Sequence, residues 1–235
     1  MKIALFGYGK MGKVIDKIAK NRDHKIIYRI DENSINYDLK KVDVAIDFST
    51  PKAAFSNINM ALENSIPIIS GTTGWLDNYN KAVKLCNEKN GAFLYASNFS
   101  LGVNIFFEIN RQLAKIMSNH PEYVIKMKEI HHIEKIDAPS GTAITLAESI
   151  IKETDYQKWS LNKDFKENEI SIEAQRLSDK TGTHEVIYKS DIDEIKIKHA
   201  AVNREGFGLG AVIAAEWLIG KKGVFSMKDV LNING

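Results

Sequence analysis

The chain has 235 residues, of which 44% are hydrophobic and 26% are charged, a balance typical of a globular protein with a substantial core. Its 32 basic and 30 acidic residues leave a net charge of +2, so charge alone indicates neither a nucleic-acid partner nor a membrane partner. One cysteine allows no internal disulfide, and the lack of a long apolar run or a signal-peptide pattern predicts a cytoplasmic protein.

A glycine-rich turn lies close to the N-terminus. Residues 3–6 predict a buried strand, and a helix with one apolar face is predicted to begin near Met11. Between them stands G-x-G-x-x-G, in the strand-to-helix context in which this motif binds the pyrophosphate of a dinucleotide. A tight turn without a ligand is the alternative. The predicted cofactor-binding residues of this turn are Gly7, Tyr8, Gly9, Lys10, Met11 and Gly12.

An acidic residue follows the second predicted strand, residues 25–30. Asp31 stands about 20 residues beyond the glycines, where a carboxylate can bind the ribose hydroxyls of NAD, although a plain surface carboxylate is also possible. The 2′-phosphate of NADP would be repelled by both Asp31 and Glu32. Lys10 and Arg29 are the basic residues expected nearby. We therefore predict that NADH serves at least as well as NADPH.

Three more strands are predicted, at residues 42–48, 66–70 and 92–95, with helices between them from Pro51 and from Leu76. This alternation predicts an α/β fold with a doubly wound parallel sheet of the Rossmann type. Such sheets bind ligands at the carboxyl ends of their strands, where the glycine turn and the acidic residue both fall. The cysteine, Cys86, is expected in the core, on one helix stripe with Leu76, Tyr79 and Val83.

Beyond residue 100 strands no longer alternate with helices, which predicts a second domain of the α+β class. A helix is predicted at residues 101–117, and residues 154–168 form a polar stretch. The predicted strands of this part are residues 121–128, 170–176, 183–190 and 194–199. A last helix at residues 206–219 is apolar nearly all round and is expected to be buried or to lie at an interface.

Two histidines, a lysine and a Ser-Gly-Thr turn stand close together in residues 129–143. The predicted strand at residues 121–128 leads into His131 and His132. Adjacent side chains of a strand point to opposite faces, so the two histidines cannot do the same job unless the strand ends there. Ser140 is a plausible N-cap for a helix whose apolar stripe is Ile144, Ala147 and Ile151. The free N–H groups of a helix N-terminus bind carboxylates or phosphates. Purely structural histidines and a plain helix cap remain the alternative.

The same run matches Glu-x-His-His-x-x-Lys-x-Asp-Ala-Pro-Ser-Gly-Thr-Ala at every specified position and resembles the signature of the dihydrodipicolinate reductase family. Further similar segments are Gly71-Thr72-Thr73-Gly74, residues 98–100 and 102–104, Arg176, Gly182, His184 and the C-terminal residues 204–231. Ser178 departs from the usual glycine, the glycine turn is one residue shorter than in many members, and residues 32–41 are shorter too.

The resemblance implies a Rossmann-like dinucleotide-binding domain at residues 1–100 and 206–235, and an α+β substrate-binding and oligomerisation domain at residues 101–205. It also implies a homotetramer without metal, which reduces the cyclic imine dicarboxylate derived from 4-hydroxytetrahydrodipicolinate with NADH and/or NADPH. His131 would donate a proton and Lys135 would supply a positive charge. The implied substrate-binding residues are His132, Ser140, Gly141 and Thr142, and the further implied cofactor-binding residues are Gly71, Thr72, Thr73, Ala96, Ser97, Asn98 and Phe99.

Three other functions remain open. Another nicotinamide enzyme, such as an aspartate or homoserine dehydrogenase, would share the first domain but would not explain the histidine–lysine run. A nucleotide-sensing regulator should carry a basic recognition helix, which the sequence does not show. A metallohydrolase could use His131, His132, His184 and His199, but adjacent histidines without H-E-x-x-H disfavour it.

Overall fold

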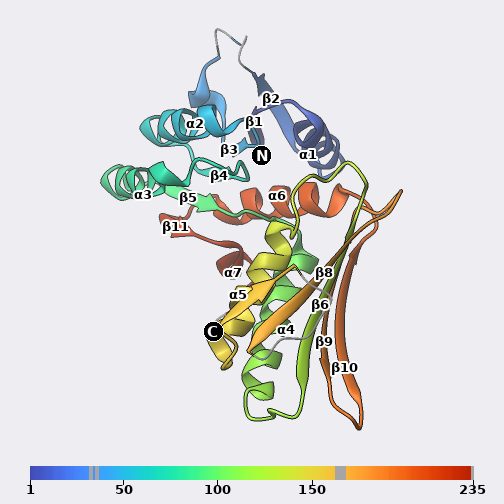
Figure 1. The fold of residues 1–235 in the computed structure, drawn as a ribbon. Coiled ribbons are helices and arrows are strands. Elements are labelled where there is room, and N and C mark those ends of the chain that lie inside the picture. Colours follow the sequence, from blue (N-terminus) through green and yellow to red (C-terminus); the bar gives the residue numbers. More distant parts are fainter. Residues whose placement is uncertain (32–33, 35–36, 162–167, 234–235) are drawn as a thin grey trace. The chain divides into compact units, whose positions relative to one another are not determined.

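The computed structural model describes residues 1–31, 34, 37–161 and 168–233. The chain divides into two compact units, Met1–Leu101 with Glu205–Gly235, and Gly102–Arg204 (Figure 1). The first contains a parallel sheet with alternating helices and the second a mixed sheet, so the predicted fold class is confirmed. Among the described residues, no helix has both the length and the apolar character needed to cross a membrane.

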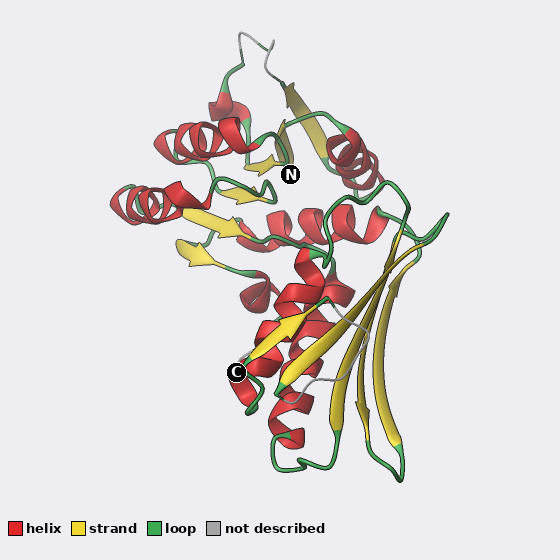
Figure 2. Ribbon diagram, in the orientation of Figure 1, coloured by secondary structure: helices red, strands yellow, loops and turns green. Residues whose placement is uncertain are grey.

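The first unit is built on a six-stranded parallel sheet in the order β11-β5-β4-β3-β1-β2 (Figure 2). Its strands are β1 (Lys2–Phe6), β2 (Lys25–Ile30), β3 (Val44–Asp47), β4 (Ile68–Ser70), β5 (Ala92–Tyr95) and β11 (Gly223–Phe225). Its helices are α1 (Lys10–Asn21), α2 (Pro51–Glu63), α3 (Tyr79–Glu88), α6 (Glu205–Leu218) and α7 (Met227–Val230), with short 3₁₀ helices η1 (Leu39–Lys41) and η2 (Leu76–Asn78).

Helices cover both faces of this sheet. Buried residues of α1 and α6 share one hydrophobic core with the sheet, and buried residues of α2 and α3 share the other. Cys86 is fully buried in the second core, as predicted, but Leu76 lies outside α3 and is half exposed. Helix α2 begins at Pro51, as predicted, and the side chain of its N-cap residue Thr50 makes no capping hydrogen bond.

The C-terminal segment belongs to the first unit. Helix α6 buries small and branched residues against the sheet, which confirms the prediction of a buried helix. A side chain at Gly210 would collide with the backbone of Phe99, so glycine allows α6 to pack directly on the segment after β5. Strand β11 was not predicted. It pairs in parallel with β5 and extends the sheet at that edge.

The second unit has a five-stranded sheet in the order β10-β9-β6-β8-β7 (Figure 1). Strands β6, β8 and β7 run parallel, whereas β9 is antiparallel to β6 and to β10. Its strands are β6 (Val124–His131), β7 (Lys158–Ser160), β8 (Glu169–Arg176), β9 (Gly182–Lys189) and β10 (Glu194–Ala201), and its helices are α4 (Leu101–Met117) and α5 (Gly141–Glu153). Both helices share one core with β6, β8 and β9.

Three predictions in this unit need correction. Strand β6 begins at Val124 rather than residue 121 and runs through His131, so the first histidine lies within the strand. Part of the polar stretch forms β7, a strand that was not predicted, while residues 162–167 of it lie outside the described residues. The buried stripe of α5 is not the predicted one: Ile144 and Ile151 are only partly buried, and the residues that enter the core are Ala143, Leu146, Ala147 and Ile150.

Candidate active site

The glycine turn between β1 and α1 has the geometry that a dinucleotide requires. Gly7 has a φ of +90°, and a side chain there would collide with the carbonyl oxygen of Phe48. A side chain at Gly12 would collide with the carbonyl oxygen of Gly7, so α1 packs closely on the turn. At Gly9 a Cβ would meet no atom within 4 Å. The backbone at Gly9 is therefore open to a ligand, as the second glycine of the motif must be.

Two cavities meet at this turn. The larger, about 640 Å³, is lined by Gly7, Tyr8, Gly9 and Asp31, among others. The smaller, about 370 Å³, joins the turn to the loop after β4, and its lining residues are Gly9, Lys10, Met11, Phe48, Ser49, Pro51, Gly71, Thr72 and Thr73. Residues that are far apart in the sequence thus line adjoining cavities at the carboxyl ends of the strands.

Asp31 is exposed at the end of β2, and its backbone N–H and carboxylate both bond Ser34 Oγ at 2.9 Å. Glu32 lies outside the described residues. Residues 96–99 are not among the described residues that line the two cavities. Phe99 is buried and packs on Phe48 with ring centroids 5.6 Å apart. It therefore supports the cavity wall.

Asp47, at the end of β3, was not predicted as a site residue. Its carboxylate is fully buried and accepts hydrogen bonds from Ser49, Asn57, Ser70 and Thr72 over 2.6–2.9 Å. Burial raises the pKa of Asp47, while these four side-chain donors oppose that change. The carboxylate therefore fixes Thr72 and Ser49, which line the smaller cavity. An acidic residue at the end of an otherwise apolar strand was the only sequence signal.

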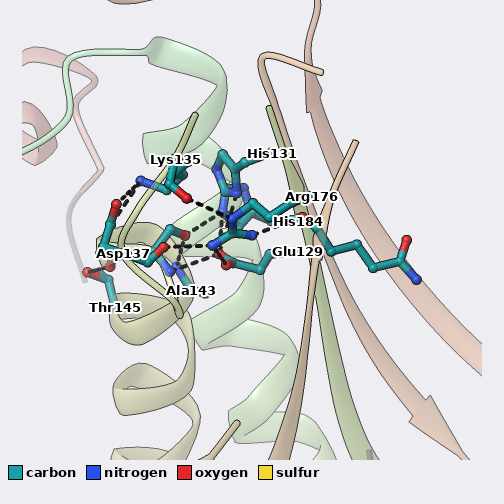
Figure 3. A network of polar contacts seen from close by, with 11 residues as sticks. Glu129, His131, Lys135, Asp137, Ala143, Thr145, Arg176 and His184 are labelled. Atoms are coloured by element: carbon teal, nitrogen blue, oxygen red, sulfur yellow. Dashed lines mark hydrogen bonds and ion pairs between the residues drawn. The ribbon is translucent and has the colours of Figure 1, made fainter. Parts of the chain in front are cut away.

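In the second unit a buried carboxylate organises the histidine–lysine run (Figure 3). Glu129 is fully buried on β6, where its carboxylate accepts hydrogen bonds from the Ser140 backbone N–H at 2.9 Å and from the Arg176 guanidinium at 3.2 Å. The same carboxylate lies 3.6 Å from His131 Nδ1 and 3.8 Å from His184 Nε2. Glu129 was quoted within the signature without a role, and its position shows that it joins strand, helix N-terminus and both histidines.

His131 and His184 face each other with ring centroids 5.0 Å apart, and both are buried. Burial lowers the pKa of His131, the nearby Lys135 and Arg176 lower it further, and Glu129 and Asp137 oppose this. Burial also lowers the pKa of His184 to about 3, so this ring is neutral at pH 7. Its Nε2 lies 3.0 Å from Ser140 Oγ, the helix cap. The sequence placed His184 in the family pattern without a role in the proposed site, and its contact with Ser140 was not predicted.

Lys135 and Arg176 hold the loop after β6. The Lys135 ammonium bonds both carboxylate oxygens of Asp137, at 2.8 and 2.9 Å. Arg176 donates to the carbonyl oxygens of Lys135 at 3.2 Å and of Asp137 at 2.6 Å, in addition to Glu129. The guanidinium therefore fixes the loop that carries Lys135, while the lysine side chain is held by an exposed carboxylate.

The N-terminus of α5 matches the predicted anion site. Ser140 is its N-cap, and its Oγ accepts a hydrogen bond from the Ala143 N–H at 3.2 Å. Within the described residues, the backbone N–H groups of Gly141 and Thr142 have no acceptor, and a Cβ at Gly141 would meet no atom within 4 Å. The Ser140 N–H is different, because Glu129 already occupies it. Two of the three predicted backbone donors are thus open to a ligand.

His132 lies just past β6 and is not in the cluster around Glu129. It lines a separate cavity of about 510 Å³, together with Ile133, Glu134, Ser178, Asp179, Lys180, Thr181 and Arg204. The strand ends at His131, so His132 lies outside it, and the two histidines line different parts of the second unit. Ser178, where the family usually has glycine, also lines this cavity.

Glu129, His131 and His184 form a group that could in principle hold a metal ion, with one ligand atom from each within 4.8 Å of the others. The surrounding charges do not fit a cation. The Glu129 carboxylate is already bonded by a backbone N–H and a guanidinium, and Arg176 would repel a metal at this point. His199, another histidine of the metallohydrolase alternative, packs on Phe106 with ring centroids 6.0 Å apart. Hydrogen bonds from Ser140 and Arg176 thus account for the burial of the Glu129 carboxylate without a metal.

Two family models match nearly the whole chain: "Dihydrodipicolinate reductase, N-terminus" over residues 1–99 and "Dihydrodipicolinate reductase, C-terminus" over residues 102–231. A 4-hydroxy-tetrahydrodipicolinate reductase from Christiangramia forsetii is 54% identical over 235 residues, which cover 99% of this chain and 98% of that protein. The protein of that name from Caldanaerobacter subterraneus is 36% identical, over 95% of this chain and 94% of its own length.

Among solved structures, a dipicolinate-bound dihydrodipicolinate reductase from Paenisporosarcina matches with a TM-score of 0.78, covering 96% of this chain and 97% of that one. At 20% sequence identity this likeness shows a shared fold. The two family models and the relatives show more, because they span both units and the relatives are 54% and 36% identical to this chain. The chain belongs to the dihydrodipicolinate reductase family.

Proposed function

We propose that the protein reduces the cyclic imine derived from 4-hydroxytetrahydrodipicolinate, with hydride from NADH or NADPH. Relatives that are 54% and 36% identical over most of this chain are named 4-hydroxy-tetrahydrodipicolinate reductase. The observation that carries the proposal is the arrangement around Glu129, which joins His131 and the open N-terminus of α5 within one unit. A small dicarboxylate is a ligand suited to such a group of donors.

The first unit supplies the dinucleotide site in this proposal. Gly7, Gly9 and Gly12 meet the three requirements of a pyrophosphate-binding turn, and Asp31 lines the larger cavity, where it would accept hydrogen bonds from ribose hydroxyls. Gly71, Thr72 and Thr73 would contact the nicotinamide end, with residues 96–99 behind them. When bound, reduced nicotinamide supplies the hydride.

The second unit would bind the substrate and move a proton. The Gly141 and Thr142 N–H groups would bind one carboxylate without adding net charge. His132, which lines a separate cavity in the free protein, would have to move to reach the other carboxylate. His131 would donate a proton to neutralise the negative charge that hydride addition creates. Its pKa is lowered in the free protein, and a bound dicarboxylate would raise it again by adding negative charge nearby.

Lys135 would stabilise negative charge on the substrate once it is released from Asp137. That carboxylate is 60% exposed, so the ion pair is weak and a substrate carboxylate could replace it. Ser140 has two parts in this scheme: its side chain caps α5, and its N–H holds Glu129. It would therefore position the anion site rather than bind the substrate through its own N–H.

A homotetramer located in the cytoplasm completes the proposal. The resemblance to the family implies that the sheet of the second unit joins four subunits. The edge strand β10 leaves Glu194, Ile195 and Lys196 exposed, and this supports association through that strand. Light scattering on the purified protein tests the state directly, since a monomer would rule it out.

The decisive experiment follows nicotinamide absorbance while the imine is generated enzymatically in the same cuvette. Rapid oxidation of NADH or NADPH that depends on the imine is expected. Aspartate, homoserine and aspartate semialdehyde serve as comparison substrates, because the competing dehydrogenases would act on them. Oxidation or reduction of the nicotinamide with one of these, and none with the imine, would contradict the proposal.

A further inference from the structure

The buried carboxylate of Asp16 accepts a hydrogen bond from Tyr8, a residue of the glycine turn. Asp16 lies on α1 and is 3% exposed. Its carboxylate accepts hydrogen bonds from the Tyr8 hydroxyl at 2.6 Å and from Arg29 Nε at 2.8 Å, and Lys20 Nζ lies 3.0 Å from its other oxygen. Burial raises the pKa of Asp16, but Arg29, Tyr8 and Lys20 together hold that pKa at about 2. The carboxylate is therefore charged at pH 7.

The hydrogen bond to the Asp16 carboxylate fixes the orientation of the Arg29 side chain. Arg29 lies on β2, two residues before Asp31, and its side chain is 35% exposed. Besides the bond to Asp16, its guanidinium lies over the ring of Tyr8, 5.4 Å from the centroid, within cation–π range. Two contacts of the guanidinium thus fix a cation that is close in sequence to Asp31, the proposed ribose-binding residue.

The cavity that Asp31 lines lacks a positive charge. Its described lining residues are Phe6, Gly7, Tyr8, Gly9, Ile30, Asp31, Ser34, Tyr37, Phe48, Ser49, Thr50, Ala53 and Asn57, and none of these is lysine or arginine. Sites that bind NADP in this fold place an arginine against the 2′-phosphate. Arg29 is the arginine of the described chain that stands closest in sequence to Asp31, but it is bonded to Asp16.

We propose that Asp16 is a specificity-determining residue, which withholds the Arg29 guanidinium from the 2′-phosphate position and so favours NADH over NADPH. The inference rests on the proposed binding of nicotinamide dinucleotide by the first unit. It predicts that cofactor choice depends on a carboxylate on α1 that does not line the cavity itself.

The test measures dissociation constants for NADH and NADPH at low salt by nicotinamide fluorescence, in four proteins: the unmodified chain, Asp16→Asn, Arg29→Gln and the double variant. Asparagine keeps an acceptor for Tyr8 but removes the charge that holds Arg29. In Asp16→Asn the affinity for NADPH relative to NADH should rise about fivefold or more. In Arg29→Gln the ratio should stay within about twofold of the unmodified protein, and the double variant should lose the gain.

Lys20→Gln is the matched control, because it removes another cation from the same carboxylate while the Arg29 bond remains. The ratio should not change in this variant. Circular dichroism checks the fold of each protein, and Asp16→Ser repeats the test if asparagine is not tolerated.

Three results would overturn the inference: no change in either Asp16 variant, a selective loss of NADPH affinity in Arg29→Gln alone, or a gain that persists in the double variant. A gain that persists in the double variant would show that the Asp16 charge weakens NADPH binding without acting through Arg29. Dinucleotide binding needs no imine, so the two proposals can fail separately. An unmodified protein that binds NADH but does not reduce the imine would contradict the proposed function. The ratios of NADPH to NADH affinity would still decide the role of Asp16.

Discussion

The Arg176 guanidinium lies 3.2 Å from the Glu129 carboxylate and also donates hydrogen bonds to the loop that carries Lys135. Glu129 is fully buried, and its second oxygen holds the N–H of the helix cap Ser140. One buried ion pair therefore connects the proposed proton donor on β6, the proposed cation in the loop and the anion site at α5.

Replacing Glu129 with Gln should shift the pH profile of catalysis toward acid. The Glu129 charge keeps the pKa of His131 from falling further, so its removal lowers that pKa. If protonated His131 is the donor, kcat/KM falls as pH rises through its pKa in the free enzyme, and this fall should begin at lower pH in the variant. Gln retains an acceptor for Ser140, so unfolding free energy should drop by only about 1–3 kcal/mol.

Glu185→Gln is the control for this variant. Glu185 lies on β9 of the same sheet and pairs with Lys198 at 2.9 Å. It should leave the profile unchanged. An unshifted profile in Glu129→Gln would show that another group controls the titration.

Replacing His131 or Lys135 with Ala should lower kcat/KM about 100-fold or more, because each would supply a proton or a charge to the developing negative charge. Dinucleotide affinity should not change, since both residues belong to the second unit. Steady-state kinetics and a separate binding titration make the comparison. Lys152 is an exposed lysine at the other end of α5, and its replacement with Ala should leave kcat/KM unchanged. Near-normal turnover in both site variants would refute the assigned roles.

Dipicolinate, a planar dicarboxylate, should compete with the substrate and protect residues 131–142 from hydrogen exchange. The open N–H groups of Gly141 and Thr142 motivate this expectation. In a His132→Ala, Thr142→Val double variant the inhibition constant should rise about tenfold or more, because the carboxylates lose two proposed side-chain donors while the backbone N–H groups remain. Thr145→Val, one turn further along α5, is the matched control. Equal inhibition of the double variant would show that neither the His132 nor the Thr142 side chain binds the carboxylates.

Local patterns predicted most of the elements but missed two of the shortest strands. The bounds of β2, β5 and α4 were predicted to the residue, because period and flanking turns mark them. Strands β7 and β11 have three residues each, too few for a periodic signal, and exist because a neighbouring strand accepts them. The stripe of α5 was misplaced because Ile144 and Ile151 also fit a helical period.

In the candidate site, too, the sequence predicted local features but not contacts between distant residues. The glycine turn and the cap at Ser140 are local features, and the structure has both. The contacts made by Glu129 and Asp16 are not local: Arg176 is 47 residues from Glu129 and Arg29 is 13 from Asp16. Polar residues at buried positions leave no periodic signal, so their partners emerge only when the chain is folded.

Asp31→Ala should shift cofactor preference toward NADPH, mainly by weakening NADH. The unmodified protein should use NADH at least as well as NADPH, because Asp31 lines the cavity as an acceptor for ribose hydroxyls and would repel a 2′-phosphate. In the variant, kcat/KM for NADH should fall about five- to tenfold, the loss of one charge-assisted hydrogen bond.

The gain for NADPH in Asp31→Ala should be smaller, because Arg29 stays bonded to Asp16 and does not reach the phosphate. The measurement is kcat/KM for each cofactor at matched, low ionic strength, since salt screens a phosphate effect. Asp77→Ala removes an equal charge from η2, outside the cavity, and should leave both values unchanged. A strong NADPH preference in the unmodified protein would mean that Lys10 or Arg29 outweighs Asp31, and that the ion pair with Asp16 opens when the cofactor binds.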